Sequence, residues 1–233
     1  PRSPPAPAAG TAAVAPAGTR LAEALAPWAV PPMAPAEVAP LDPPADRRLA
    51  PLVATLRPEA AVVLGAAADG IALALATAAR DLGLSTVVAA IDPFVGGPDD
   101  LAIDRRRAAL PRAGLYPLLY DRLVRSIDRH GLAGRLLAVP AEPAPVLAHL
   151  AASGVRVALG HADLAAERED FRPDLDALWP IVAPGGAVFG HVAVPDLIGR
   201  EMQVRRWAAR AGAGLAIGRA GADGRAMVVL RRR

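Results

Sequence analysis

The chain contains Ala61-Val-Val-Leu-Gly65-Ala-Ala-Ala-Asp69-Gly70, a short apolar run that ends at a glycine and continues into a loop of small residues. The Ala- and Leu-rich segment from Ile71 to Ala79 follows and is typical of a helix. A strand, a tight turn and a helix in this order direct backbone N–H groups and the positive end of a helix dipole toward an anionic or carboxylate-bearing ligand. Small side chains let such a ligand approach the backbone closely. This unit therefore predicts an α/β domain with a ligand site at its first turn.

Two classes of cofactor site use such a turn: dinucleotide-binding domains and S-adenosylmethionine (SAM) domains. The spacing Gly65-x-Ala67-x-x-Gly70 is close to the glycine fingerprint of the first class and to the looser glycine-rich loop of the second. A strand-to-helix turn that binds no ligand is the third alternative. The loop alone does not separate the three.

Composition excludes several classes of protein. The chain has 233 residues, of which 53% are hydrophobic, enough for one substantial core. The absence of cysteine excludes disulfides and thiolate metal sites. A net charge of only +3, with 3% aromatic residues and no dense basic run, gives no indication of nucleic-acid binding. No apolar run approaches the roughly 20 residues that span a bilayer, so we expect a cytoplasmic protein without membrane contact.

Residues 1–44 differ in composition from the rest, because they are dense in proline and alanine. We predict a flexible tether over residues 1–18 and, over residues 19–44, an arm laid partly on the main domain. Within the arm, Thr19 to Leu25 is predicted as a short helix with Thr19 as its N-cap and Leu21, Leu25 and Trp28 as its apolar stripe. The chain begins Pro1-Arg-Ser-Pro-Pro, without an initiator Met or a signal-peptide core, so we expect processing, or a longer protein in which this segment joins another domain.

From residue 45 the chain alternates regularly between helical and strand patterns. A first helix is predicted at 45–56. Strands are then predicted at 61–65, 86–91, 135–139, 155–160 and 186–191, and helices at 69–82, 115–130, 143–153, 172–182 and 196–211. Continuous apolar strands, each followed by a helix, imply a parallel sheet covered on both faces. Two final strands at 214–218 and 226–230, joined by a turn-rich segment, predict an antiparallel hairpin.

Asp92 ends the second predicted strand, in Thr86-Val-Val-Ala-Ala-Ile-Asp92-Pro-Phe94, roughly 20 residues beyond Gly70. A carboxylate at this place in an α/β domain accepts hydrogen bonds from a ribose diol. Phe94 follows where an aromatic ring can stack on adenine. The alternative for Asp92 is a turn-initiating residue before Pro93.

A third stretch runs from Asp174 to His191, where a helix ends in Pro184-Gly185-Gly186 and leads straight into a strand. Together with the turn at Ile91–Phe94 and the closing hairpin, it resembles the class I SAM-dependent methyltransferases over about residues 45–231. It is similar in particular to a bacterial branch with His-x-Asp after the fourth strand and His after the fifth. The resemblance implies a Rossmann-like domain over 45–233, with a mostly parallel seven-stranded sheet, an antiparallel last strand and helices on both faces.

The same resemblance implies SAM as cofactor and a set of site residues. The cofactor would contact Gly65, Ala66, Ala67, Asp69, Asp92, Pro93, Phe94 and Glu142. The catalytic residues would be His161, Asp163 and His191. An imidazole there is suited to act as the base. The alternative for each histidine is a structural residue whose ring bonds to backbone groups.

The chain departs from the family pattern at several places. Val63 stands where the family has an acidic residue before the first glycine, and Ala165 and Val192 stand at carboxylate positions after the fourth and fifth strands. Some family members bind a divalent cation there, but Asp163 alone cannot form an oxygen-rich site. We therefore expect no metal.

The preferred hypothesis is methyl transfer from SAM to a hydroxyl of a small molecule or glycan, at a rate that rises through about pH 6–7 as a histidine loses its proton. The alternative is a methyltransferase-like domain that has lost catalysis and serves in binding or assembly, which the departures favour. A nicotinamide-dependent oxidoreductase is the third hypothesis, and the Pro-Gly-Gly turn and closing hairpin argue against it.

Overall fold

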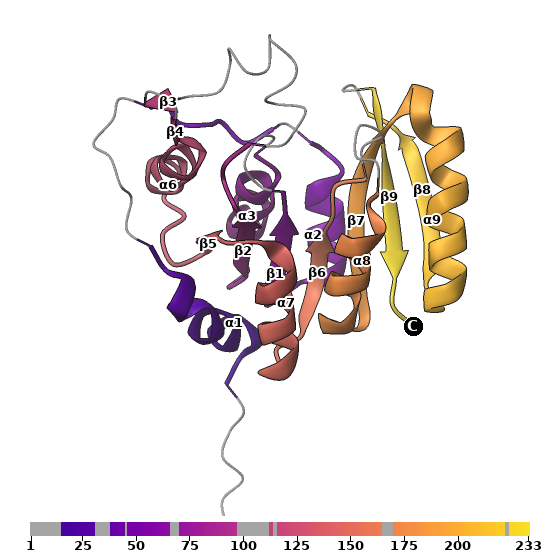
Figure 1. Cartoon of the computed structure of the whole chain (residues 1–233), viewed down its shortest axis with the longest axis horizontal. Helices are drawn as coiled ribbons and strands as arrows, with labels where there is room; N and C mark the ends of the chain where they lie inside the picture. Colours follow the sequence, from indigo (N-terminus) through magenta and orange to yellow (C-terminus); the bar gives the residue numbers. More distant parts are fainter. Residues whose placement is uncertain are drawn as a thin grey trace, which may run out of the picture.

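The computed structural model describes residues 15–30, 38–44, 46–65, 70–96, 112–113, 116–164, 170–221 and 224–233. In these ranges a twisted sheet lies between two layers of helices (Figure 1). In chain order the elements are α1 (Ala17–Leu25), η1 (Ala26–Trp28), α2 (Leu49–Leu56), β1 (Ala60–Leu64), α3 (Ile71–Asp81), β2 (Val87–Asp92), β3 (Arg112–Ala113), β4 (Tyr116–Pro117), α6 (Leu119–Arg129), β5 (Leu136–Pro140), α7 (Pro143–Ala152), β6 (Val157–His161), α8 (Arg172–Leu178), η2 (Trp179–Ile181), β7 (Val182–Ala193), η3 (Val194–Asp196), α9 (Leu197–Ala211), β8 (Gly214–Ala220) and β9 (Arg225–Arg231).

The main sheet has seven strands in the order β5-β2-β1-β6-β7-β9-β8. The pairs among β5, β2, β1, β6 and β7 are all parallel. The last strand, β9, lies antiparallel between β7 and β8. The predicted fold class is thereby confirmed, including the antiparallel last strand. A separate short antiparallel pair, β3 with β4, was not predicted.

The two helical layers follow from the pattern of β1, whose five residues are all buried. Ala60, Val62 and Leu64 belong to the core cluster that includes residues of α1, α7, α8 and α9. Ala61 and Val63 belong to the opposite cluster, with residues of α2, α3 and α6. Because successive strand residues point to opposite faces, a continuous apolar strand needs a helical layer on each side. Each fully buried Val or Leu side chain contributes about 1.5–3 kcal/mol.

The N-terminal arm joins the core through α1. Leu21 and Leu25 are buried at 0% and 3% exposure in the cluster that covers one face of the sheet. The N–H of Ala17 donates to Glu59 Oε2 at 2.9 Å. Gly18 lies so close to the end of the α2–β1 connection that a Cβ would stand 2.7 Å from the Glu59 carbonyl oxygen.

Two sequence predictions for the arm are wrong. The tether was predicted to extend through residue 18, but Ala17 and Gly18 already belong to α1. Thr19 was predicted as the N-cap, but the capping position is Pro16, with no side-chain capping bond. Helix α1 therefore begins two residues before Thr19, the polar residue expected to cap it. Residues 1–14 lie outside the described part of the chain, so the predicted flexibility there stays a prediction.

The other predicted boundaries agree within two residues, except at three helices and one strand. The helix predicted from residue 45 begins at Leu49, and the one predicted from 115 begins at Leu119, after Pro117. The helix predicted to reach 182 ends at Leu178 and passes through η2 into β7, which begins at Val182. Pro184-Gly185-Gly186 therefore lies inside the strand rather than at a helix end. The N–H of Gly185 donates to the carbonyl of Arg232 at 2.9 Å, which extends pairing along this edge.

Within the described ranges, no helix combines the length and hydropathy needed to cross a bilayer.

Gly190 in β7 offers a test of how closely the strands and loops pack. A Cβ there would stand 2.5 Å from the Ala162 carbonyl oxygen and 2.6 Å from Leu164 Cγ. Because a backbone oxygen cannot move aside cheaply, Gly190→Ala should lower the free energy of unfolding by about 3 kcal/mol in urea titrations. Gly199→Ala is the control, since no atom of the described residues lies within 4 Å of its Cβ and alanine favours helix α9. Equal unfolding midpoints for the two variants would contradict this packing.

Candidate functional site

The candidate site lies at the edge where β1, β2, β6 and β7 end. These strands run parallel, and ligands of open α/β sheets bind outside the carboxyl ends of the strands. Gly65 follows β1, Asp92 ends β2, His161 ends β6, and His191 lies two residues before the end of β7. The structure thus brings together predicted residues from four strands.

Gly65 adopts the left-handed conformation, with φ of 70°. Its N–H donates to the carbonyl of Ile91 at 3.3 Å, which ties the turn to β2. Among the described residues, a Cβ at Gly65 would have a single close neighbour, Asp163 Cβ, at 4.0 Å. That part of the chain therefore leaves the Gly65 backbone open to close approach. Three further residues predicted to hold a cofactor, Ala66, Ala67 and Asp69, lie outside the described residues, and their role stays a prediction.

Gly70, the N-cap of α3, is also left-handed, with φ of 65°. The arm passes directly over it, because a Cβ at Gly70 would stand 3.1 Å from Pro44 Cδ. Just upstream, the N–H of Leu41 donates to Ser126 Oγ at 2.8 Å, and the Leu41 carbonyl lies 3.0 Å from His130 Nε2. Residues 38–44 are thus fixed between α6 and the start of α3, beside the candidate site.

Asp92 forms the turn that the alternative interpretation predicted. Its Oδ1 accepts the N–H of Phe94 at 2.6 Å, and the side chain is 8% exposed. Phe94 has φ of 57° and only 4% exposure, and its ring packs edge-to-face on Tyr120 with centroids 5.4 Å apart. The predicted stacking of Phe94 on adenine is not supported, because the turn directs its ring into the core. Pro93 is half-buried at the site edge, and Glu142 is exposed at the N-cap of α7.

His161 is a buried residue, at 3% exposure, that links β6 to β1. Its Nδ1 lies 3.3 Å from the Leu64 carbonyl, as the structural alternative predicted. Its ring centroid is 5.0 Å from that of Phe189 and 6.1 Å from that of His191. Asp163 is half-buried and lies beside Gly65.

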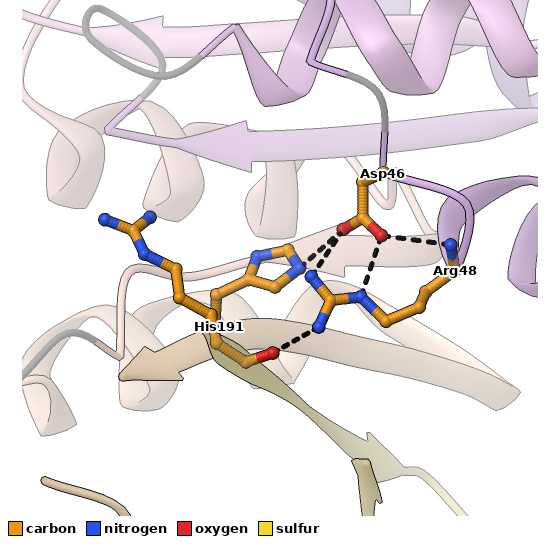
Figure 2. A network of polar contacts seen from close by, with 4 residues as sticks. Asp46, Arg48 and His191 are labelled. Carbon is orange, nitrogen blue, oxygen red and sulfur yellow. Dashed lines mark hydrogen bonds and ion pairs between the residues drawn. The ribbon is translucent and has the colours of Figure 1, made fainter. Parts of the chain in front are cut away.

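His191 belongs to a cluster of three side chains, His191, Asp46 and Arg48 (Figure 2). His191 Nε2 lies 2.9 Å from Asp46 Oδ2, and each of these two side chains is 8% exposed. Arg48 donates to Asp46 three times: from Nε to Oδ1 at 2.8 Å, from Nη2 to Oδ2 at 3.1 Å, and from its backbone N–H to Oδ1 at 3.0 Å. Nη1 of Arg48 bonds to the carbonyl of Arg225 in β9. The chain ahead of α2 is thus joined to both β7 and β9.

Burial lowers the pKa of His191 to about 4, and the charges of His161 and Arg48 act in the same direction, against the attraction of Asp46. Burial alone would raise the pKa of Asp46, but the hydrogen bonds and charge of Arg48 outweigh it and hold that pKa below its ordinary value. His191 is therefore neutral, and Asp46 ionised, at neutral pH. A pKa of about 4 lies below the range of about pH 6–7 in which the rate is predicted to rise, so His191 does not account for such a rise; the rate profile itself stays a prediction.

Asp46 and Arg48 were not predicted as site residues. The local signal was present, since Asp46-x-Arg48 ahead of α2 recurs as Asp170-x-Arg172 at the start of α8. Arg172 makes the same three bonds to Asp170, at 3.0, 2.8 and 2.7 Å. The pattern predicts the pairing within each motif. Nothing in it indicates the contact between Asp46 and His191, which are 145 residues apart.

Across the described ranges, no three His, Cys, Asp or Glu side chains are grouped in a way that would hold a metal ion. Metal independence stays a prediction.

Solved structures share this fold. An O-methyltransferase from Bacillus cereus in complex with SAH aligns with a TM-score of 0.56 at 15% identity, over 92% of this chain and 91% of that one. The O-methyltransferase TomG from Streptomyces achromogenes, involved in tomaymycin synthesis and in complex with SAM, aligns with a TM-score of 0.54 at 15% identity, over 93% and 90%. A methyltransferase from Geobacter sulfurreducens aligns with a TM-score of 0.52 at 17% identity, over 83% and 81%.

No protein-family model and no curated protein sequence matches the chain. At these identities the similarity establishes the methyltransferase fold alone.

The lowered pKa of His191 predicts that the stability of the fold depends on pH. The folded-state pKa of about 4 lies below the ordinary 6.5, so the unfolded chain takes up the proton first as pH falls. The contribution of the neutral His191 to the free energy of unfolding is fully present above about pH 6.5. It is lost as the pH falls toward 4, and the loss amounts to about 3 kcal/mol. His191→Gln removes the titrating group, so the difference in unfolding free energy between parent and variant should change by that amount from pH 7 to 4. His149→Gln, at an exposed histidine, is the control. Parallel profiles for the parent and His191→Gln would contradict the lowered pKa.

Proposed function

We propose that this chain is a SAM-dependent methyltransferase that transfers a methyl group to a hydroxyl of a small molecule or glycan. The observation that carries the proposal is the sheet: β9 lies antiparallel between β7 and β8, on a parallel sheet whose β1 ends at an open left-handed glycine. Structures that share the fold include O-methyltransferases bound to SAM and to SAH. The open backbone at Gly65 and the buried carboxylate of Asp92 fit a cofactor with a charged amino-acid end and a ribose.

In this proposal the methionine part of SAM lies against the backbone of Gly65, toward the start of α3. The N-terminus of α3 has no side-chain cap and favours a carboxylate through its dipole. Asp92 accepts hydrogen bonds from the ribose hydroxyls, as a buried charged acceptor. When bound, SAM supplies an electrophilic methyl group on a positively charged sulfur.

The chain itself has two tasks in such a reaction: to align the acceptor hydroxyl with the methyl group, and to take its proton. His191 can take the proton, because burial keeps its imidazole neutral above about pH 4. His161 and Asp163 line the same edge between Gly65 and His191. Their polar groups are suited to orient the acceptor.

A second candidate function is a methyltransferase-like domain that binds without catalysing. The observations that favour it are the packing of Pro44 on Gly70 and the burial of Phe94 in the core. The two candidates differ in turnover: the first transfers labelled methyl groups from SAM to a hydroxyl acceptor, and the second binds SAM or SAH unchanged.

The cofactor proposal is tested by calorimetry with SAM and with S-adenosylhomocysteine. Asp92→Asn keeps an oxygen for the Phe94 N–H but replaces the charged acceptor, so the affinity should fall by about 10- to 100-fold. Asp128→Asn, at an exposed carboxylate on α6, should bind as the parent does. A parent that binds neither compound refutes the proposal, and unchanged affinity in Asp92→Asn places the ribose elsewhere.

The proposed transfer needs no divalent cation, because only Asp163 stands in the family's carboxylate set and one carboxylate holds such an ion weakly. Methyl transfer measured in the presence of EDTA should therefore equal the untreated rate. Loss of the activity on chelation, with recovery on adding magnesium or manganese, would contradict a base-only mechanism.

A further inference from the structure

We infer that Asp46 is a positioning residue for His191: it holds the imidazole with its proton on Nε2, so that Nδ1 is the atom that takes the proton of the acceptor hydroxyl. The transfer of the hydroxyl proton to Nδ1 rests on the proposed function, whereas the position of the hydrogen on Nε2 does not.

The contact between Asp46 and His191 determines which nitrogen carries the proton. A carboxylate can only accept hydrogen bonds, and a neutral imidazole has one N–H donor and one acceptor nitrogen. With Asp46 Oδ2 at 2.9 Å from Nε2, the hydrogen of the neutral ring must lie on Nε2. Nδ1 then carries the lone pair.

Arg48 keeps the carboxylate of Asp46 in this orientation and in its charged form. Its side chain donates to both oxygens, from Nε at 2.8 Å and from Nη2 at 3.1 Å. The guanidinium is itself anchored on the carbonyl of Arg225 in β9, beside the strand that carries His191 (Figure 2). Within the described ranges, the charged or titratable groups that act on the pKa of His191 are Asp46 and Arg48, from the chain ahead of α2, and His161 from β6.

Nδ1 of His191 is placed to receive a proton. Among the described residues, no group forms a hydrogen bond with it. Nor is Nδ1 sealed in the core, because it is not among the fully buried side-chain atoms of the described residues that lack a hydrogen-bond partner. His191 lies near the carboxyl end of β7, at the edge where the ligand site is expected.

The second Asp-x-Arg motif shows what Asp46 does beyond starting a helix. Asp170 and Arg172 form the same local pairing at the start of α8, and their side chains are 39% and 56% exposed. A helix start therefore needs neither burial nor a histidine. Asp46 is 8% exposed and in contact with His191, which gives it a role that the exposed copy lacks.

In the reaction, the acceptor oxygen forms a bond to the methyl carbon of the SAM sulfonium as its own proton moves to Nδ1 of His191. The sulfur–carbon bond breaks, its electron pair stays on sulfur, and the product is a neutral thioether and a methyl ether. His191 becomes an imidazolium whose Nε2–H still faces the negative charge of Asp46. The proton then passes from Nδ1 to solvent, which restores the neutral ring.

The test uses the full chain and Asp46→Asn. Two donors of Arg48, its backbone N–H and Nε, reach Oδ1, whereas only Nη2 reaches Oδ2, so the amide oxygen is expected at the Oδ1 position. The amide N–H₂ then faces Nε2, which reverses the tautomer. Long-range ¹H–¹⁵N spectra at pH 7 should show the parent His191 with hydrogen on Nε2 and the variant with hydrogen on Nδ1. With catechol as the hydroxyl probe, kcat should fall at least about 100-fold in Asp46→Asn, with the KM for SAM within twofold of the parent.

Asp170→Asn is the matched control, and it should leave the tautomer and kcat unchanged. A parent ring with its hydrogen on Nδ1 overturns the inference without any variant, so a failure of Asp46→Asn to fold does not remove the test. An Asp46→Asn protein that reverses the tautomer but keeps the parent kcat also overturns it. A parent that binds no SAM refutes the proposed function alone, since the ring is observed without cofactor.

Discussion

Strand β1 is buried along its whole length, and its backbone hydrogen bonds go to β2 on one side and β6 on the other. Since both of its faces carry only Ala, Val and Leu, each face must be covered by helices, and the chain must cross from one layer to the other. The crossings leave the sheet at the carboxyl ends of its strands, where ligands of open α/β sheets bind. The place of the candidate site follows from that burial, with Gly65 at the first crossing.

The N-terminal arm adds a second constraint. It touches Ser126 on α6, Gly70 at the start of α3 and, through Asp46, His191 on β7. A buried charge is costly unless it is paired, so Asp46 requires both Arg48 and a polar partner on the sheet. The arm is therefore in contact with the candidate site, and a change in the position of Asp46 would reach His191 directly.

The sequence predicted the parts of the structure that depend on local pattern. Apolar runs located the parallel strands to within two residues, apart from the start of β7, and the terminal hairpin identified the antiparallel strand. Where one residue type serves two purposes, the pattern could not choose: Asp92 fits both a ribose acceptor and a turn, and the structure shows the turn. The local pattern does not predict contacts between segments that are distant in sequence. The burial of Phe94 depends on Tyr120, and the role of Asp46 depends on His191, and neither partner is near in sequence.

The central claim is that the edge formed by Gly65, Asp92 and His191 is a cofactor site completed by the N-terminal arm. A crystal structure of the chain with S-adenosylhomocysteine tests it most directly. The account predicts the ligand across the ends of β1 and β2, with its ribose on Asp92, its amino-acid end against the backbone of Gly65, and the contact between Asp46 and His191 intact beside its sulfur. A ligand bound away from this edge, or an arm displaced so that Asp46 leaves His191, would contradict it.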